Sequence, residues 1–180
     1  ADLLYLMISI SDNTATNHLI RTAGMDRINT TMKELGMLDS RLSRFMLGRL
    51  AVQGELENLA TANDYARITH AIVTCKAAQS ASCHAMLDLL SLQQNNHRIG
   101  RYVPKDPQFR WGSKNGTNPG IAHDVGFISS PSGTLVLAIF VQGVVEEVEG
   151  EQIIADIAAA AIHDAFPSIC GTAGLRNDQE

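Results

Sequence analysis

The sequence predicts an α/β fold of the α+β kind, in which a helical region precedes three antiparallel strands and a C-terminal covering helix. Three observations predict it. Apolar residues recur at helical spacing through the first hundred residues, Pro104 and Pro107 then interrupt this pattern, and three strand-like segments follow. A last Ala- and Ile-rich segment, 150–166, has a helical period and stops at Pro167. Elements in this order are typical of a sheet covered by helices.

The helical region divides at residues that cap or break helices. Gly24 and Gly36 close two of the predicted helices. Thr61, followed three residues later by Asp64, resembles a capping box that opens a longer helix. The predicted helices begin near Leu3 and then cover 14–23, 26–35, 62–78 and 82–93.

Three strands are predicted after the prolines, over 109–117, 121–129 and 134–142. The link Ser-Ser-Pro-Ser-Gly between the last two has the composition of a hairpin turn. The third strand contains Thr-Leu-Val-Leu-Ala-Ile-Phe-Val, which is almost wholly apolar. We therefore expect this strand to be buried on both faces.

The 180 residues are enough for one domain. We expect residues 1–100 to form a mainly helical region and 101–180 to form the strands and the last helix. The chain begins in the middle of a pattern, because Ala1 and Asp2 lead straight into apolar periodicity. The expectation is therefore one incomplete domain, as in a cut product or a fragment.

Composition and charge limit the possible partners. Hydrophobic residues make up 45% of the chain and charged residues 18%, which is ordinary for a globular protein. The net charge is -5 and no run of Lys or Arg is present, so a nucleic-acid partner has no electrostatic support. No apolar run reaches the length of a membrane span.

The three cysteines, Cys75, Cys83 and Cys170, have no His at zinc-ligand spacing beside them. Cys75 and Cys83 flank a short polar link and could form a local disulfide in an exported protein. Two buried free thiols are an equally good interpretation. If Cys75 and Cys83 form the disulfide, Cys170 would have no cysteine left to pair with.

Two tripeptides carry the functional signal. Residues 11–13 read Ser-Asp-Asn directly after an apolar helical turn, and residues 114–116 read Lys-Asn-Gly on the first predicted strand. Either one alone is an ordinary capping loop or turn. In class A β-lactamases and penicillin-binding proteins, however, Ser-x-x-Lys, Ser-Asp-Asn and Lys-Thr-Gly occur in this order. The chain thus resembles the C-terminal portion of the serine β-lactamase-like hydrolase family, over nearly its whole length, and the resemblance implies the β-lactamase/transpeptidase-like fold.

The resemblance implies a role for each residue of the two motifs. Ser11 would relay a proton to the departing ring nitrogen, Lys114 would supply positive charge to the substrate carboxylate and to Ser11, and the Thr117 N–H would be an oxyanion donor. Asn13 would bind the side-chain amide of the substrate and Asp12 would hold the loop. Asn115 and Gly116 would touch the substrate. This chemistry requires no metal and no organic cofactor.

The sequence departs from the family pattern at the nucleophile. Only ten residues precede Ser11, and none of the four lysines has a Ser three positions before it. The nucleophile would then come from a missing N-terminal segment, cleaved off or carried on another polypeptide. We expect the chain to pair with that segment or with a second copy of itself. We expect this chain alone to be inactive.

The glutamate that deacylates class A enzymes is also in doubt. The segment Gly-Glu-Leu-Glu-Asn offers Glu55, Glu57 and Asn58. If Asn58 matches the Asn of the family, Gly54 takes the position of the glutamate. Solvated loop carboxylates are the favoured interpretation of Glu55 and Glu57.

Three functions are therefore compared. The first is β-lactam hydrolysis through an acyl-enzyme by the complete protein. The second is a penicillin-binding-protein-like D-Ala-D-Ala peptidase or esterase that acts on peptidoglycan peptides, which weak deacylation would favour. The third is a non-catalytic fragment or pseudoenzyme that pairs with another chain, since core positions such as Leu3, Leu4, Val136, Leu137 and Phe140 would be uncovered. The resemblance implies a periplasmic or secreted location.

His123 and Asp124 are neighbours on a strand, would face opposite sides, and are interpreted as structural.

Overall fold

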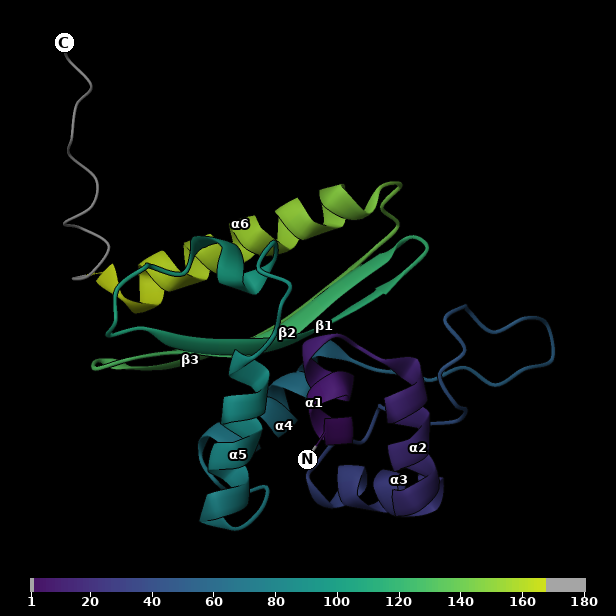
Figure 1. Cartoon of the computed structure of the whole chain (residues 1–180). Helices are drawn as coiled ribbons and strands as arrows, with labels where there is room; N and C mark the ends of the chain where they lie inside the picture. Colours follow the sequence, from purple (N-terminus) through teal and green to yellow (C-terminus); the bar gives the residue numbers. More distant parts are fainter. Residues whose placement is uncertain (1, 168–180) are drawn as a thin grey trace.

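The computed structural model describes residues 2–167 (Figure 1). Cys170 lies outside these residues. In chain order the elements are α1 (Asp2–Ser9), α2 (Asn13–Ala23), α3 (Met25–Glu34), α4 (Ala62–Val73), α5 (Ser80–Ser91), the 3₁₀ helix η1 (Ile99–Tyr102), β1 (Arg110–Asn118), β2 (Ile121–Ser130), β3 (Gly133–Gln142) and α6 (Glu147–Ala165). Helices followed by three antiparallel strands and a last helix confirm the predicted fold class.

The helices lie where the capping signals predict them, with one clear difference. The Thr61 hydroxyl accepts a hydrogen bond from the Asp64 N–H and opens α4. The predicted helix over 62–78 was too long, because α4 ends at Val73. Cys75 follows with a φ of 53°, in the left-handed region that an L-residue adopts only at a turn. The chain therefore turns there and starts α5 at Ser80.

The disulfide left open by the sequence is formed. Cys75 and Cys83 are bonded, with their Cα atoms 5.5 Å apart. The bond ties the turn after α4 to the first turns of α5. These two helices are therefore joined at one end by a covalent link.

The sheet has the order β1-β2-β3, and both pairs are antiparallel. Lys114 lies opposite Val125, and Val125 lies opposite Ala138. The prediction that the apolar strand 134–142 is buried on both faces was wrong. β2 takes the central place and carries the buried residues, whereas β3 forms an edge of the described sheet and is mostly half-buried.

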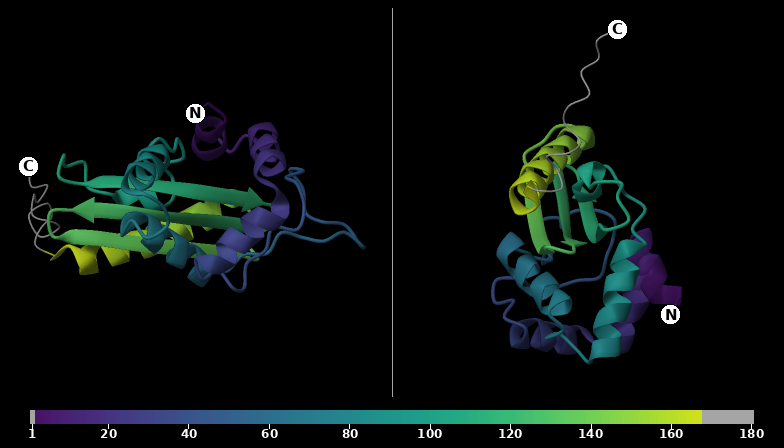
Figure 2. Two further views of the ribbon diagram at one scale, coloured as in Figure 1. Left: turned by 90° about the horizontal axis from the view of Figure 1, so that it is seen from below. Right: turned by 90° about the vertical axis from the view of Figure 1, so that its left-hand side faces the viewer.

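Helices lie on both faces of the sheet (Figure 2). α6 packs on one face, where the buried core includes Ala122, Ile128, Ile139, Ile154 and Ala158. α4 and α5 pack on the other face, α4 mainly against β3 and α5 against β1. The described helices include none that is long and apolar enough to cross a membrane.

The contact between α5 and β1 is close because Gly112 has no side chain. A Cβ atom at this position would lie 2.6 Å from the backbone of Leu90 and Ser91, which is too short for a real contact. Glycine thus lets the end of α5 rest directly on β1. This packing brings Gln93, just after α5, beside the Lys-Asn-Gly segment.

Candidate active site

The Ser-Asp-Asn segment forms the turn between α1 and α2. Ser11 has a φ of 57°, which is unusual for a residue other than glycine and is often found at functional sites. The Asp12 carboxylate accepts a hydrogen bond from the Ala15 N–H at 2.6 Å and caps α2. Asn13 is the first residue of α2. Asp12 therefore holds the turn that presents Ser11.

The structure brings the two motifs together. Lys114 Nζ donates a hydrogen bond to Ser11 Oγ, although the two residues are 103 positions apart in the chain. The same ammonium group donates to the Asn115 backbone oxygen at 2.6 Å. The segment that resembles Lys-Thr-Gly thus faces the Ser-Asp-Asn turn directly, and a ligand that binds to β1 would meet both.

The charge of Lys114 is set by its surroundings. Burial lowers the pKa of the Lys114 ammonium to about 8, while the nearby Asp124 carboxylate acts in the opposite direction. Asp124 is buried itself, and burial raises the pKa of its carboxyl group to about 6. The Ile99 N–H donates to this carboxylate at 3.1 Å. The Ser113 hydroxyl lies near enough to lower the pKa of Asp124 but lies outside hydrogen-bond geometry.

His123 lies on the other side of β2 from Asp124. Its ring stacks on Phe140 with 4.1 Å between centroids, and its Nδ1 accepts from the Val141 N–H at 3.2 Å. These contacts occupy the His123 ring on the face that α4 covers, since Phe140 also meets Tyr65 of α4. His123 and Asp124 therefore do not form a pair.

A buried guanidinium that sequence reasoning missed supports β1 from behind. Arg98 is fully buried. Its guanidinium donates to the Gly116 oxygen at 3.0 Å, to Thr117 Oγ1 at 2.6 Å and to the His123 oxygen at 2.8 Å. Glu147 and Glu151 of α6 balance its charge, at 2.9 and 3.4 Å. No local pattern could have found Arg98, because its partners come from three separate elements.

Gln93 is a second residue without a sequence signal. Its Nε2 donates to Asn115 Oδ1 at 3.0 Å and to the Ile8 backbone oxygen at 3.3 Å. Gln93 therefore links the end of α1 to the Lys-Asn-Gly segment. It fixes the side chain of Asn115, the residue that departs from the Lys-Thr-Gly pattern.

Besides the Ser-Asp-Asn turn and the Lys-Asn-Gly segment, the loop between α3 and α4 also borders the site. Arg41 and Leu59 pair across its base, so we call residues 41–59 the 41–59 loop. Asn17 of α2 holds this loop through two hydrogen bonds of 2.8 Å, one to the Met46 oxygen and one from the Met46 N–H. Two residues on, a Cβ atom at Gly48 would lie 3.6 Å from Asn13 Nδ2. Residues 46–48 are thus the part of the loop that lies beside α2, with Met46 bonded to Asn17 and Gly48 next to Asn13.

Gly48 also lines a pocket beside the site. The pocket has a volume of about 290 Å³ and runs along the end of β1 and the turn that follows it. Its walls include Thr117, Pro119, Val145 and Glu147. A substrate group that extends past Thr117 would enter this space.

The residues whose deacylation role the sequence left in doubt make their contacts within the 41–59 loop. Glu55 pairs with Arg49 at 2.7 Å, and Glu57 pairs with Arg44 at 2.8 Å. The hydrogen bond from its arginine is the main cause that lowers the pKa of each carboxyl to about 2. Asn58 Oδ1 accepts from the N–H groups of Ser43 and Arg44. All the hydrogen-bond partners of Glu55, Glu57 and Asn58 lie within the 41–59 loop.

Gly54 takes the position of the family glutamate if Asn58 matches the family Asn. It borders open space, since a Cβ atom added there would meet nothing within 4 Å. In the part of the chain that the structure describes, no group of three His, Cys, Asp or Glu side chains could hold a metal ion.

A Ser-Asp-Asn turn hydrogen-bonded to a Lys-x-Gly strand, in this fold, defines a serine β-lactamase-like hydrolase. The family model described as the Beta-lactamase enzyme family matches residues 1–166, and the chain belongs to this family. No curated protein sequence matches the chain.

Solved structures agree with this assignment. A β-lactamase from Sphaerobacter thermophilus is 51% identical, with a TM-score of 0.89 over 91% of this chain and 62% of that protein. An ancestral class A β-lactamase is 23% identical, with a TM-score of 0.81 over 91% of this chain and 64% of that protein. The chain therefore spans a little under two thirds of the length of these structures.

Proposed function

We propose that the complete protein opens β-lactam rings through an acyl-enzyme, and that this chain supplies the groups that protonate and hold the substrate. The observation that carries the proposal is the hydrogen bond from Lys114 to Ser11, which joins the two family motifs in one site. Family membership and the 51% identity to a β-lactamase support the same activity.

The proposed acylation uses three groups of this chain. A serine outside the described residues attacks the lactam carbonyl carbon, and the Thr117 N–H stabilises the oxyanion that forms. The C–N bond of the ring then breaks. The proton of the attacking serine leaves through its base and reaches the ring nitrogen by way of Ser11. Lys114 favours this relay because its positive charge stabilises a transient negative charge on Ser11 Oγ.

Substrate binding is assigned to residues of β1 and to Asn13 at the start of α2, which lie on either side of this relay. Lys114 attracts the substrate carboxylate, and Asn115 Nδ2 donates to it, since Asn115 Oδ1 is already bonded to Gln93. Gly116 is exposed and lets the substrate lie close to β1. Asn13 hydrogen-bonds the side-chain amide, which would point toward Gly48 and the pocket along β1.

The location of the nucleophile is part of the proposal. We assign it to an N-terminal segment or a partner chain outside residues 1–180, because neither Lys114 nor any other lysine follows a Ser at the required spacing. We also propose a periplasmic or secreted location. The disulfide between Cys75 and Cys83 supports an oxidising compartment.

Two alternatives have support of their own. A D-Ala-D-Ala peptidase or esterase is favoured by the ion pairs that occupy Glu55 and Glu57. A non-catalytic chain that pairs with another is favoured by the apolar edge strand β3. Cleavage of a D-Ala-D-Ala peptide would identify the peptidase. Acylation by a penicillin without peptide cleavage would identify the first function, and neither reaction would identify the non-catalytic chain.

Intact-mass spectrometry tests the proposal. The complete protein should gain the mass of one opened β-lactam after it is mixed with a penicillin. Ser11→Ala should slow this gain at least about 100-fold, because it removes the proton relay. Thr22→Ala is a matched control that removes an exposed hydroxyl on α2, and it should acylate normally. A complete protein that never gains this mass would refute the proposal.

A further inference from the structure

The inference concerns the second half of the reaction and rests on the proposed function. Release of an acyl group from a serine ester requires water to attack the carbonyl carbon. A general base must take one proton from this water, and it must lie within hydrogen-bond reach of the water, at about 2.6–3.2 Å. The base also works best when its pKa lies near the working pH. The question is which described carboxylate meets these requirements.

The loop wall that faces the site carries no carboxylate. Residues 46–48 are Met, Leu and Gly; Asn17 binds both the N–H and the oxygen of Met46, and Gly48 lies beside Asn13. Asn58 Nδ2 also contacts Met46 Sδ at 3.8 Å. A thioether is a weak acceptor and takes no proton at neutral pH. The side chain that this wall offers at position 46 is therefore unable to activate water.

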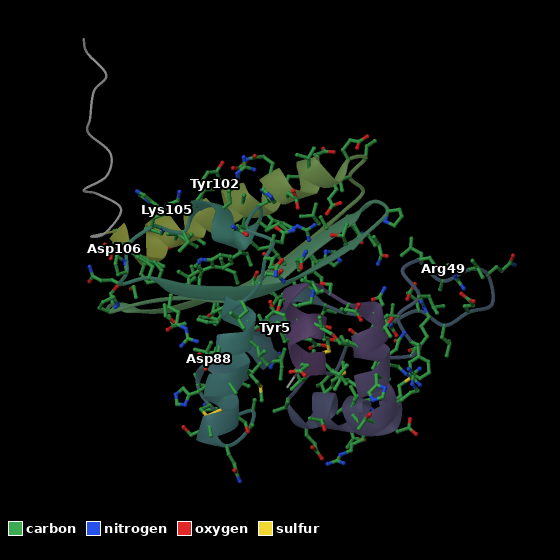
Figure 3. All side chains as sticks on the ribbon, viewed as in Figure 1. Tyr5, Arg49, Asp88, Tyr102, Lys105 and Asp106 are labelled. Carbon is green, nitrogen blue, oxygen red and sulfur yellow. A yellow bond between two sulfur atoms is a disulfide. The ribbon has the colours of Figure 1, made fainter. Side chains whose placement is uncertain are left out.

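The two glutamates of the 41–59 loop are engaged with arginines. Arg44 donates to both oxygens of Glu57, and Arg49 donates to both oxygens of Glu55. Figure 3 shows Arg49 on the part of the loop that projects away from the strands and helices. A carboxylate that accepts two hydrogen bonds from a guanidinium, with a pKa of about 2, is a poor base. Neither glutamate can serve without breaking its ion pair.

Three other carboxylates lie close to the motifs, and each is committed. Asp12 caps α2. Asp124 is buried beneath the strand and accepts from the Ile99 N–H. Glu147 accepts from Arg98 and from Thr117 Oγ1 at 2.9 and 3.1 Å, and it is the strongest rival because its side chain is 55% exposed.

We propose that the complete protein forms a long-lived acyl-enzyme with β-lactams, because the loop residue that Asn17 holds beside α2 is Met46 rather than a carboxylate, and the two loop glutamates are held in ion pairs. The protein then captures β-lactams in a one-to-one complex and releases them slowly. Met46→Glu should convert it into an efficient hydrolase, because it sets a carboxylate on backbone that Asn17 already holds.

The test follows the acylated complete protein by intact-mass spectrometry after excess penicillin is removed. We expect the adduct of the unmodified protein to persist and Met46→Glu to release it at least about 100-fold faster, the usual contribution of a general base. Met46→Gln is the matched control, since it has the same side-chain length without a carboxylate, and it should release no faster than the unmodified protein. The melting temperature and the acylation rate of both variants show that the site is still folded.

Each outcome has a distinct meaning. Failure of the unmodified protein to acylate would refute the proposed function itself. Acylation followed by rapid release would refute only the inference, and Glu57→Gln, Glu55→Gln and Glu147→Gln would then identify the base by slowing release. Met46→Glu and Met46→Gln releasing at the same rate, with acylation intact, would also overturn the role assigned to Met46.

Discussion

Lys114 does two jobs that depend on its charge, since it contacts Ser11 and is proposed to attract the substrate carboxylate. Its pKa is lowered to about 8 mainly because burial disfavours the charged form. The ammonium group is therefore protonated at neutral pH and begins to lose its proton in a range that enzyme assays can reach.

We predict that the second-order acylation rate constant falls as the pH rises through about 8. The rate constant falls because Lys114 is neutral above its pKa and then no longer attracts a carboxylate. Stopped-flow acylation with nitrocefin from pH 6 to pH 10 measures the profile, which reports the free enzyme. Lys114→Arg keeps its charge over this range and should lose the alkaline decline. A flat profile for the unmodified protein would contradict the prediction.

Arg98 shows how much one buried side chain can stabilise. We predict that Arg98→Met lowers the free energy of unfolding by about 3 kcal/mol, because it removes the positive charge that balances Glu151 and the donor that the Gly116 oxygen accepts from. Arg110→Met is the control, since the Arg110–Asp88 pair is exposed and should contribute less than about 1 kcal/mol. Urea denaturation compares the two. Equal effects would mean that Arg98 is not a structural support.

Elements were predictable where their signals are local. Thr61 and Gly24 mark helix ends by hydrogen bonds or backbone angles within a few residues, and the structure has helix boundaries at both. The early end of α4 and the half-burial of β3 depend on partners that a local pattern does not contain. The pairing of Ser11 with Lys114 was predictable only from the order of the motifs. The contacts of Arg98 and Gln93, and the two hydrogen bonds between Asn17 and Met46, join segments far apart in sequence, so no periodicity could reveal them.

The covalent link between α4 and α5 should stabilise the chain measurably. Its closed loop is short, with a sequence separation of 8, so loop-closure entropy predicts roughly 2–3 kcal/mol. We expect the Cys75→Ser, Cys83→Ser double variant to unfold at lower urea by that amount. Reductant should have the same effect on the unmodified protein and none on the variant. An unchanged midpoint in both experiments would rule out this contribution.

The contact between α5 and β1 should tolerate no side chain. We predict that Gly112→Ala destabilises the protein by about 1–3 kcal/mol, because the added methyl group would press on the backbone of Leu90 and Ser91. Gly116→Ala, on the same strand with open space around it, is the control for stability. Thermal unfolding of the two variants should separate clearly, and coincident curves would contradict the close packing.

At the scale of the whole molecule, the groups proposed for substrate binding and proton relay lie on elements that are far apart in the chain. α1, α2 and the 41–59 loop come before the sheet, and β1 and α6 come with it or after it (Figure 1). The site therefore exists only when helices and sheet are packed together. Catalysis by the complete protein should be lost in the same transition as the fold.

The edge strand β3 has a consequence for how such a molecule is made. Each hairpin of the sheet connects neighbours in sequence, so both can form early. A strand that joins the outer edge of β3 would have to arrive from a remote segment or from another molecule, and until then this apolar edge offers its backbone to any extended chain. When the protein refolds after dilution from denaturant, pairing of the β3 edge with its own strand therefore competes with aggregation. The chain concentration, rather than the final stability, then decides the yield of folded protein.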